Sequence, residues 1–260
     1  MRGMDYKLLM DTAMLAGKLM LQSGAETYRV EDTMHHILKT SNLEKTEILV
    51  IMTGISASIS GEDVAPISMA QRVDTRSTNL SVIEQINHIS RRYCAGELSL
   101  DEAYCLLNDV KSVTYPRWVS ILAPTGVAIG FTVFFDGTYY DVLATIIVGI
   151  FLSGIMLAGK GAGIPDLILD ILNAVSVGIA ALVMKRIMGD VMNLDTVIIG
   201  SIMPLVPGVA ITNAVRDTFQ GDYISGCARL LEAFLKAAFV ALGIGIALSV
   251  FGEFITGGIV

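Results

Sequence analysis

The chain has 260 residues, 53% of them hydrophobic, and its mean hydropathy of +0.64 is higher than that of ordinary soluble domains. The formal net charge is −7 and no basic stripe occurs, which argues against nucleic-acid binding, because contacts to phosphates need clustered Lys and Arg. Of the 43 Asp, Glu, Lys and Arg residues, 27 lie in residues 1–117. We therefore expect two domains, a polar one over residues 1–115 and a membrane domain over residues 116–260.

The polar region has the pattern of a small α+β domain. Apolar residues at helical spacing predict helices over 5–22 and 25–38, separated by Ser23-Gly24, because Gly suits a left-handed helix cap. β-branched and alternating runs predict three strands, over 46–52, 55–60 and 67–73. Two capping-box patterns, Ser81-x-x-Glu84 and Ser99-x-x-Glu102, predict helices over 80–93 and 99–111.

Metal and cofactor sites are not expected in this region. Three cysteines are too few and too scattered for a zinc site or a disulfide framework. Glu31 and Asp32 stand four residues before His35 and His36, so either pair could share a helix face, but two ligands make only half of a metal site. A solvated polar face is the simpler interpretation.

The apolar region contains five runs whose length and composition suit a bilayer crossing. Charged residues are few in them, and each run is about 17 to 25 residues long. The runs cover residues 119–135, 142–159, 167–184, 196–215 and 233–251. The fold class expected for the whole chain is therefore an α-helical membrane protein, with a small α+β domain followed by five transmembrane helices.

The Lys and Arg residues of the short loops predict the orientation of the chain. A cytoplasmic polar domain would place six of them on the inner side, namely Lys111, Arg117, Lys160, Arg216, Arg229 and Lys236. Only Lys185 and Arg186 would lie outside. We expect the N-terminus in the cytoplasm, the C-terminus outside, and the chain in the cytoplasmic (inner) membrane.

The fourth run is interrupted in its middle by prolines. Pro204 and Pro207 each lack a backbone N–H, and Gly208 follows them. In hydrocarbon, such a break is tolerated where it is buried in protein or lines a water-filled cavity, and transporters place substrate sites at breaks of this kind. The alternative is a proline kink that serves packing alone.

Three polar residues follow this break on one helical face, Asn213, Arg216 and Asp217. An arginine fork and an amide can together hold a carboxylate or an amino acid, so we interpret the three as substrate-binding or gating residues. The alternative is an ordinary ion pair at the inner interface.

Charged residues within the third and fifth runs suggest a proton or ion path. Asp170 lies about one turn inside the third run, Asp166 precedes it by four residues, and Lys236 could be the counter-charge. The alternative places both carboxylates at the interface and lets Lys236 snorkel to the headgroups.

The second helix of the polar domain carries a charged motif formed by Glu26, Arg29 and Glu31. Glu26 and Arg29 are three residues apart and share a helix face, so a structural ion pair is the simpler interpretation. The functional interpretation is a gate or a docking surface below the pore.

Several of these segments, taken together, are similar to a known family. SGAETYRVEDT (23–33), MTGISASIS (52–60), RVDTRSTNL (72–80), PLVPGVAITNAVRD (204–217) and GDYISGCARLLEA (221–233) occur in the same order in the threonine/serine exporter family. The chain resembles the N-terminal half of that family over nearly its whole length. Long family members carry a second set of membrane helices, so this chain resembles the split type, in which a separate small membrane protein supplies the other half.

The resemblance implies a secondary exporter rather than an enzyme. The implied cargo is threonine or serine, or a dicarboxylate such as succinate, which is associated with split members, and the expected driving force is the proton motive force. The implied partners are the small-molecule substrate, the lipid bilayer and a second membrane subunit, with an oligomer possible. The rival interpretations are a membrane-anchored sensor or assembly subunit, and a membrane-anchored enzyme with catalysis in residues 1–115, where no complete catalytic constellation is found.

Overall fold

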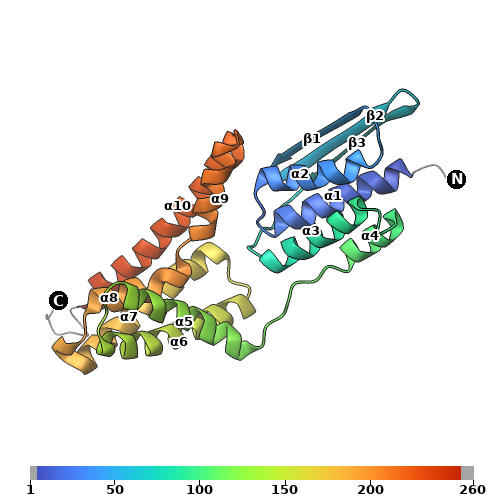
Figure 1. Ribbon diagram of the computed structural model, residues 1–260. Helices are drawn as coiled ribbons and strands as arrows, with labels where there is room; N and C mark the ends of the chain where they lie inside the picture. Colours follow the sequence, from blue (N-terminus) through green and yellow to red (C-terminus); the bar gives the residue numbers. More distant parts are fainter. Residues whose placement is uncertain (1–4, 253–260) are drawn as a thin grey trace. The chain divides into compact units, whose positions relative to one another are not determined.

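The computed structural model describes residues 5–252, and the chain forms two compact units. The first unit comprises residues 1–114 together with 209–231, and the second comprises residues 115–208 together with 232–260. Figure 1 shows the elements in chain order. The segment 209–231 is thus distant in sequence from the other part of its unit. Its return to that unit brings the residues of the candidate site together.

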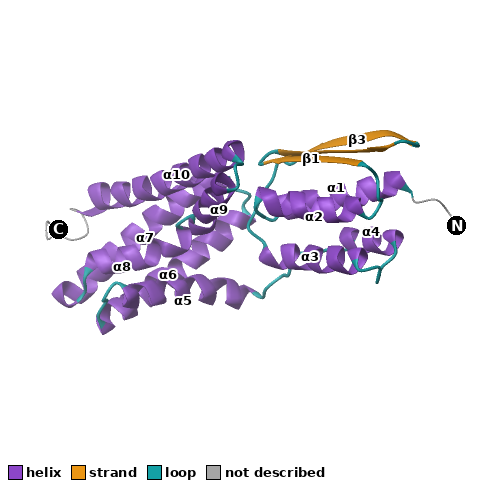
Figure 2. Ribbon diagram, turned by 45° about the horizontal axis from the view of Figure 1, so that its top comes forward, coloured by secondary structure: helices purple, strands orange, loops and turns teal. Residues whose placement is uncertain are grey.

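The first unit contains three layers. Its sheet is antiparallel in the order β1 (Lys45–Ile51), β2 (Gly54–Gly61) and β3 (Val64–Arg72). One face of the sheet is covered by α1 (Tyr6–Gln22) and α2 (Thr27–Lys39), and α3 (Leu80–Cys94) and α4 (Leu100–Asn108) lie beyond these two helices (Figure 2). The three strands predicted from the sequence are present, with ends that differ by one to three residues.

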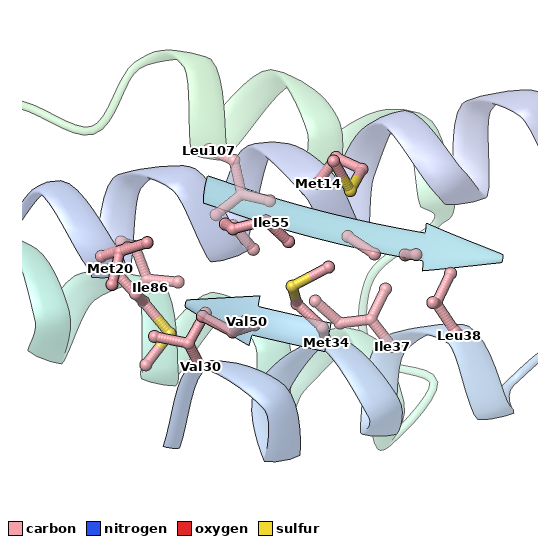
Figure 3. Packing of buried hydrophobic residues seen from close by; sticks show 14 of the residues in the cluster. Met14, Met20, Val30, Met34, Ile37, Leu38, Val50, Ile55, Ile86 and Leu107 are labelled. Carbon is pink, nitrogen blue, oxygen red and sulfur yellow. The ribbon is translucent and has the colours of Figure 1, made fainter. Parts of the chain in front are cut away.

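The core of this unit extends from the sheet through the first helix layer to α3 and α4. Figure 3 shows Met14 and Met34 from the helices close to Ile55 of β2, with Leu107 of α4 also in the cluster. The buried side chains of each helix recur at helical spacing, and those of β2 alternate, so one face of each element is apolar. This core contains no residue of 209–231, so it is complete without that segment.

Only one of the two predicted capping boxes forms. Ser99 and Glu102 cap α4 reciprocally, as expected. The prediction for Ser81 is wrong, because α3 begins at Leu80 and its N-cap is Asn79, whose side chain accepts a hydrogen bond from Val82 N. Asparagine is as good an N-cap as serine, and it stands first in the chain. The predicted end of α4 at residue 111 is also too late, because the helix ends at Asn108.

The second unit is helical, and three of its helices are long and apolar enough to cross a bilayer. They are α5 (Arg117–Phe134), α6 (Tyr139–Gly161) and α7 (Asp166–Met188), the last continuing into the short 3-10 helix η1 (Gly189–Val191). A fourth such helix, α10 (Tyr223–Ile246), begins in the first unit, continues in the second and ends in a π-helical turn, η3 (Ala247–Phe251). The described chain therefore has four apolar helices of membrane-spanning length.

A fifth crossing would consist of two short helices. These are α8 (Leu194–Ile202), extended by the 3-10 turn η2 (Met203–Leu205), and α9 (Gly208–Phe219). Together they pass the same length and hydropathy criteria, but the chain bends by 58° between them. The break falls where the two prolines predicted it, because neither can supply the N–H that a continuous helix requires.

Small residues allow close helix packing in the second unit. Thr125 of α5 lies against Gly149 of α6, and Ala174 of α7 lies against Gly243 of α10. The Thr132 and Thr145 hydroxyls form a buried hydrogen bond of 2.9 Å. Contacts of this kind stabilise helix pairs in lipid, where the hydrophobic effect gives helices little reason to associate.

Candidate functional site

The site is built on the short loop between α1 and α2. Gly24 adopts a positive φ of 82°, and Glu26, the N-cap of α2, is extended, so the chain reverses sharply and exposes the first N–H groups of α2. Glu26 forms no side-chain cap on its own helix. Thr27, the first residue of α2, is fully buried, so its N–H needs a partner from elsewhere in the unit.

That partner is Asp217 of α9. Its Oδ1 accepts a hydrogen bond of 3.0 Å from Thr27 N, and its Oδ2 accepts one of 3.1 Å from Thr27 Oγ1. The Asp217 side chain is fully buried. A carboxylate at the start of a helix is stabilised by the orphan N–H groups and by the helix dipole, which explains why this charge can lie inside the unit.

Arg229 of α10 supplies the opposite charge. Its Nε lies 2.8 Å from Asp217 Oδ2, and its Nη2 donates a 2.7 Å hydrogen bond to Ala25 O. The side chain is 7% exposed, so the pair is shielded from water. Helices α9 and α10 pack closely beside this pair. A Cβ added to Gly226 of α10 would lie only 3.1 Å from Ala214 O of α9. One cation thus contacts both the α9 carboxylate and the α1–α2 loop.

Four further side chains complete the cluster. Asn213 Nδ2 donates a 2.9 Å hydrogen bond to Gly24 O, and Arg216 Nη1 contacts Glu26 Oε1 at 2.5 Å. Arg29 Nη1 reaches the other oxygen of Glu26 at 3.5 Å. We refer to the whole set as the clasp, which comprises Glu26, Thr27, Arg29, Asn213, Arg216, Asp217 and Arg229.

The clasp has a buried centre and an accessible rim. Asp217 and Arg229 form the centre, whereas the Arg216 and Arg29 side chains are 56% and 41% exposed. Burial is the largest influence on the pKa of Glu26 and raises it, but its own backbone N–H and the two rim arginines outweigh burial, so the net pKa is lowered. Glu26 therefore remains ionised and ties α2 to α9.

Glu31, the third residue of the predicted cytoplasmic motif, lies apart from these contacts. Its Oε1 accepts a 2.9 Å hydrogen bond from Val50 N of β1. Burial raises the pKa of Glu31, the Val50 N–H lowers it, and the charge of Asp222 raises it further. Its visible role is to join α2 to the sheet. The predicted pair of Glu26 and Arg29 is present.

The predicted ion path occupies the second unit. Lys236 Nζ lies 3.6 Å from Asp170 Oδ2, so the proposed counter-charge is in place. Asp166 is exposed, whereas Asp170 and its neighbour one turn later, Asn173, are buried. Asp170 Oδ2 and Asn173 Oδ1 have no hydrogen-bond partner within the described residues. The three groups form a polar spot in an otherwise apolar helix pair.

The proline break supplies backbone rather than polar side chains. Pro204 lies within η2, Pro207 is buried between η2 and α9, and Gly208 is exposed at the start of α9. The break lets α9 run in a different direction from α8. From residue 209 onward, α9 belongs to the first unit. Its contribution is to end one helix and to begin the one that carries Asn213, Arg216 and Asp217.

Sequence reasoning did not single out three buried polar residues. Thr27 and Arg229 belong to the clasp, and their signal was their place inside two of the segments that carry the family resemblance, 23–33 and 221–233. Asp141 is 1% exposed, forms a capping box with Thr138 at the start of α6, and accepts a 2.6 Å hydrogen bond from Asn193 N at the start of α8. The T-x-x-D spacing was a detectable signal for that cap.

The chemistry available in the described chain is the binding of ions and polar groups. No cluster of three metal-ligating side chains occurs in residues 5–252. His36 Nε2 lies 3.4 Å from Asp32 Oδ1, and both side chains are more than 60% exposed, as expected for a solvated face. The clasp, in contrast, holds a buried carboxylate on two hydrogen-bond donors of Thr27 and beside the Arg229 guanidinium.

Comparison with known proteins adds a family match. A family model described as "Putative threonine/serine exporter" (ThrE) matches residues 11–251. The chain is 23% identical over 244 residues to a Mycobacterium tuberculosis protein named "Probable threonine/serine exporter", covering 92% of this chain and 46% of that protein. It is also 23% identical over 234 residues to "Probable succinate transporter subunit YjjP" of Klebsiella aerogenes, covering 90% of each. The chain thus spans about half the length of the mycobacterial relative, and no solved structure matches it.

Proposed function

We propose, from the premise that the chain belongs to the threonine/serine exporter family, that it is a subunit of a secondary exporter in the cytoplasmic membrane. Its cargo would be a small polar metabolite, either threonine or serine or a dicarboxylate such as succinate, as the names of the two relatives suggest. The proton motive force would drive transport. The relatives are named as transporters, and we propose no enzymatic activity.

The observation that carries this proposal is the buried contact of Asp217 with Thr27 and Arg229. It joins the segments 23–33 and 204–217, two of those that carry the family resemblance, through Thr27 and Asp217, which lie 190 residues apart in the chain. A buried charge cluster is costly to build, and in our proposal it switches between a closed and an open arrangement, as a gate requires. In our proposal the clasp is the inner gate, and Asn213, Arg216 and Asp217 act there.

Chain parity supports five crossings. If α5, α6 and α7 each cross the bilayer, Met188 and Arg117 lie on opposite sides. Asp217 is hydrogen-bonded to Thr27, so it lies on the side of the polar domain. The chain between Met188 and Asp217 then has to cross, which favours α8 and α9 as one broken crossing. The excess of Lys and Arg predicts that this side is the cytoplasm.

The broken crossing is the proposed path of the cargo. Pro204, Pro207 and Gly208 would expose backbone carbonyls to a polar substrate, as broken helices do in other transporters. Asp170 and Lys236, with Asp166 at the helix start, would carry the coupling proton. The relative named as a subunit supports a second membrane protein as partner, which would supply the other half of the transporter.

The proposal is tested by efflux from cells that make this chain, alone and together with the candidate partner subunit. Labelled serine, threonine and succinate are followed for wild type and for Asp217→Asn. We expect partner-dependent efflux of one cargo class, lost in the variant. The matched control is Asp63→Asn, which changes an exposed carboxylate in the turn between β2 and β3 and should export normally. Absence of efflux for all three compounds, with both proteins in the membrane, would refute the exporter assignment.

A further inference from the structure

The contacts of Asp217 have the chemistry of a receptor for a free carboxylate. One oxygen accepts from a backbone N–H, and the other accepts from a hydroxyl and faces a guanidinium. These donors come from α2 and α10, whereas the carboxylate comes from α9. We call the three groups that face this carboxylate, Thr27 N, Thr27 Oγ1 and Arg229 Nε, the carboxylate seat.

We propose that Asp217 occupies this seat in the present conformation, and that the carboxylate group of the cargo takes its place during transport. The proposal rests on the exporter function proposed above and gives it a recognition step. Asp217 would act as a built-in competitor of the cargo, and its departure from the seat would release α9 from the α1–α2 loop.

The seat is more than the start of a helix. Arg229 is a buried cation, and its Nε makes no hydrogen bond to any described residue, although it faces the Asp217 carboxylate at 2.8 Å. Its Nη2 is already held by Ala25 O, which fixes the guanidinium in position. Helix dipole, hydroxyl and fixed cation all favour an anion at one point.

An empty seat would be unfavourable, which makes exchange the expected event. Without Asp217, Arg229 would remain as an uncompensated charge inside the unit. A second carboxylate that enters as Asp217 leaves removes this penalty.

The seat is compatible with both kinds of cargo named for the two relatives. Threonine, serine and succinate differ in charge and in side groups, but each carries a carboxylate. A seat that reads only this group suits both classes. Selection between them would then depend on groups outside the seat, such as the exposed rim arginines Arg29 and Arg216.

The test is chemical rescue of Asp217→Ala in the full-length, detergent-solubilised protein. In wild type the tethered Asp217 is present at a high effective concentration and masks weak ligands. The alanine variant leaves space for formate or acetate. We expect formate to raise its Tm saturably, by about 2–4 °C at roughly five times Kd. Formamide, which is neutral, should give no such rise, and neither should formate with wild type or with Asp217→Ala/Arg229→Gln.

Serine, threonine and succinate are then added to the same variant, with serinamide as the control that lacks a carboxylate. Stabilisation by these acids but not by serinamide is the expected result. No effect of formate beyond that of formamide would overturn the seat. An effect of formate with none from the three acids would overturn its use by cargo.

A second variant covers the case in which the first does not fold, and the efflux assay separates the seat from the proposed function. If Asp217→Ala does not fold, Asp217→Ser replaces it, because the short side chain also leaves space for formate and leaves Arg229 without a counter-charge. The expected rescue by formate is the same, and its absence counts against the seat. If these acids bind to the seat but the protein shows no efflux, the seat is supported and the proposed exporter function is refuted.

Discussion

Two arginines of the clasp differ in how much their ion pairs should contribute to stability. Arg229 and Asp217 are both buried, whereas Arg216 is 56% exposed where it meets Glu26. Removing one partner of a buried pair leaves an uncompensated charge, but an exposed pair is screened by water and loses side-chain entropy when it forms. The distance in each pair is short, so burial decides the difference.

We therefore expect Arg229→Gln to lower the free energy of unfolding by about 3–5 kcal/mol. Arg216→Gln, the matched control on the neighbouring helix, should lower it by at most about 1 kcal/mol. Denaturant unfolding of both full-length variants in detergent measures the two losses. Equal losses would contradict the assignment of Arg229 to a buried centre.

Two glutamates of α2 should respond to pH in opposite directions. The pKa of Glu26 is lowered in the folded chain, so its contribution is present above the ordinary value of 4.5 and is lost as the pH falls through the lower folded pKa. The pKa of Glu31 is raised, so ionisation of Glu31 weakens the fold as the pH rises above 4.5. Glu26→Gln should reduce stability at pH 7, and Glu31→Gln should increase it.

Stability measured from pH 3 to pH 8 checks both signs. Glu31→Gln retains an acceptor for Val50 N, so a gain at pH 7 would report the charge alone. A loss at pH 7 in this variant would show that the ionised form of Glu31 is required.

At the scale of elements, the helix caps show where local sequence determines structure. The S-x-x-E pattern occurs twice, but only Ser99 uses it, because Asn79 already caps α3 two residues before Ser81. A pattern of four residues identifies a possible cap. It does not identify which of two nearby caps the chain will use, because that depends on where the first buried residue of the helix lies.

Alanine substitutions separate these caps. Ser99→Ala and Asn79→Ala should each lower stability by about 1 kcal/mol, because each leaves an N-terminal N–H without its acceptor. Ser81→Ala should change it by less than about 0.5 kcal/mol. A large loss for Ser81→Ala in thermal unfolding would contradict the observed cap.

The packing of α10 on α7 gives a second prediction at this scale. A Cβ on Gly243 would lie 2.7 Å from Ile171 O and 2.6 Å from Ala174 Cβ, whereas one on Gly245 meets nothing within 4 Å. Gly243→Ala should push α10 away from α7, cost about 1–3 kcal/mol and separate Lys236 from Asp170. Gly245→Ala should be neutral or slightly stabilising.

Tm and efflux of the two variants measure this difference. We expect both quantities to fall for Gly243→Ala and to stay near wild type for Gly245→Ala. The same loss in both variants would indicate that small residues are needed throughout α10, and not only at its contact with α7.

At the scale of the whole molecule, the local elements were predictable and the long-range partners were not. The three strands, the four helices of the polar region and the break at Pro204 and Pro207 follow from spacing and turn chemistry. The contact of Asp217 with Thr27 joins residues 190 positions apart, and no local pattern specifies which buried N–H a carboxylate will meet. The shared face of Asn213 and Asp217 was predictable, but its attachment to the α1–α2 loop was not.

The number of crossings leads to a prediction for the complete chain. With α8 and α9 as one crossing, the two ends should lie on opposite sides of the membrane, the N-terminus inside. Reporter fusions at each end, one active only in the cytoplasm and one only outside, measure this arrangement. Both ends on one side would mean that α8 and α9 form a re-entrant loop, and the parity argument from Asp217 would fail.

The divided sequence of the first unit also sets an order of events during synthesis. The core of residues 1–114 is complete without residues 209–231, so that part can fold as soon as it leaves the ribosome. Asp217 and Arg229 follow only after the intervening helices, about 5–20 s later at usual rates of elongation. If one of those helices were inserted wrongly, the α9–α10 hairpin would emerge on the far side of the membrane, and Thr27 would find no partner. The clasp would thus distinguish correctly inserted chains from misinserted ones before any cargo is moved.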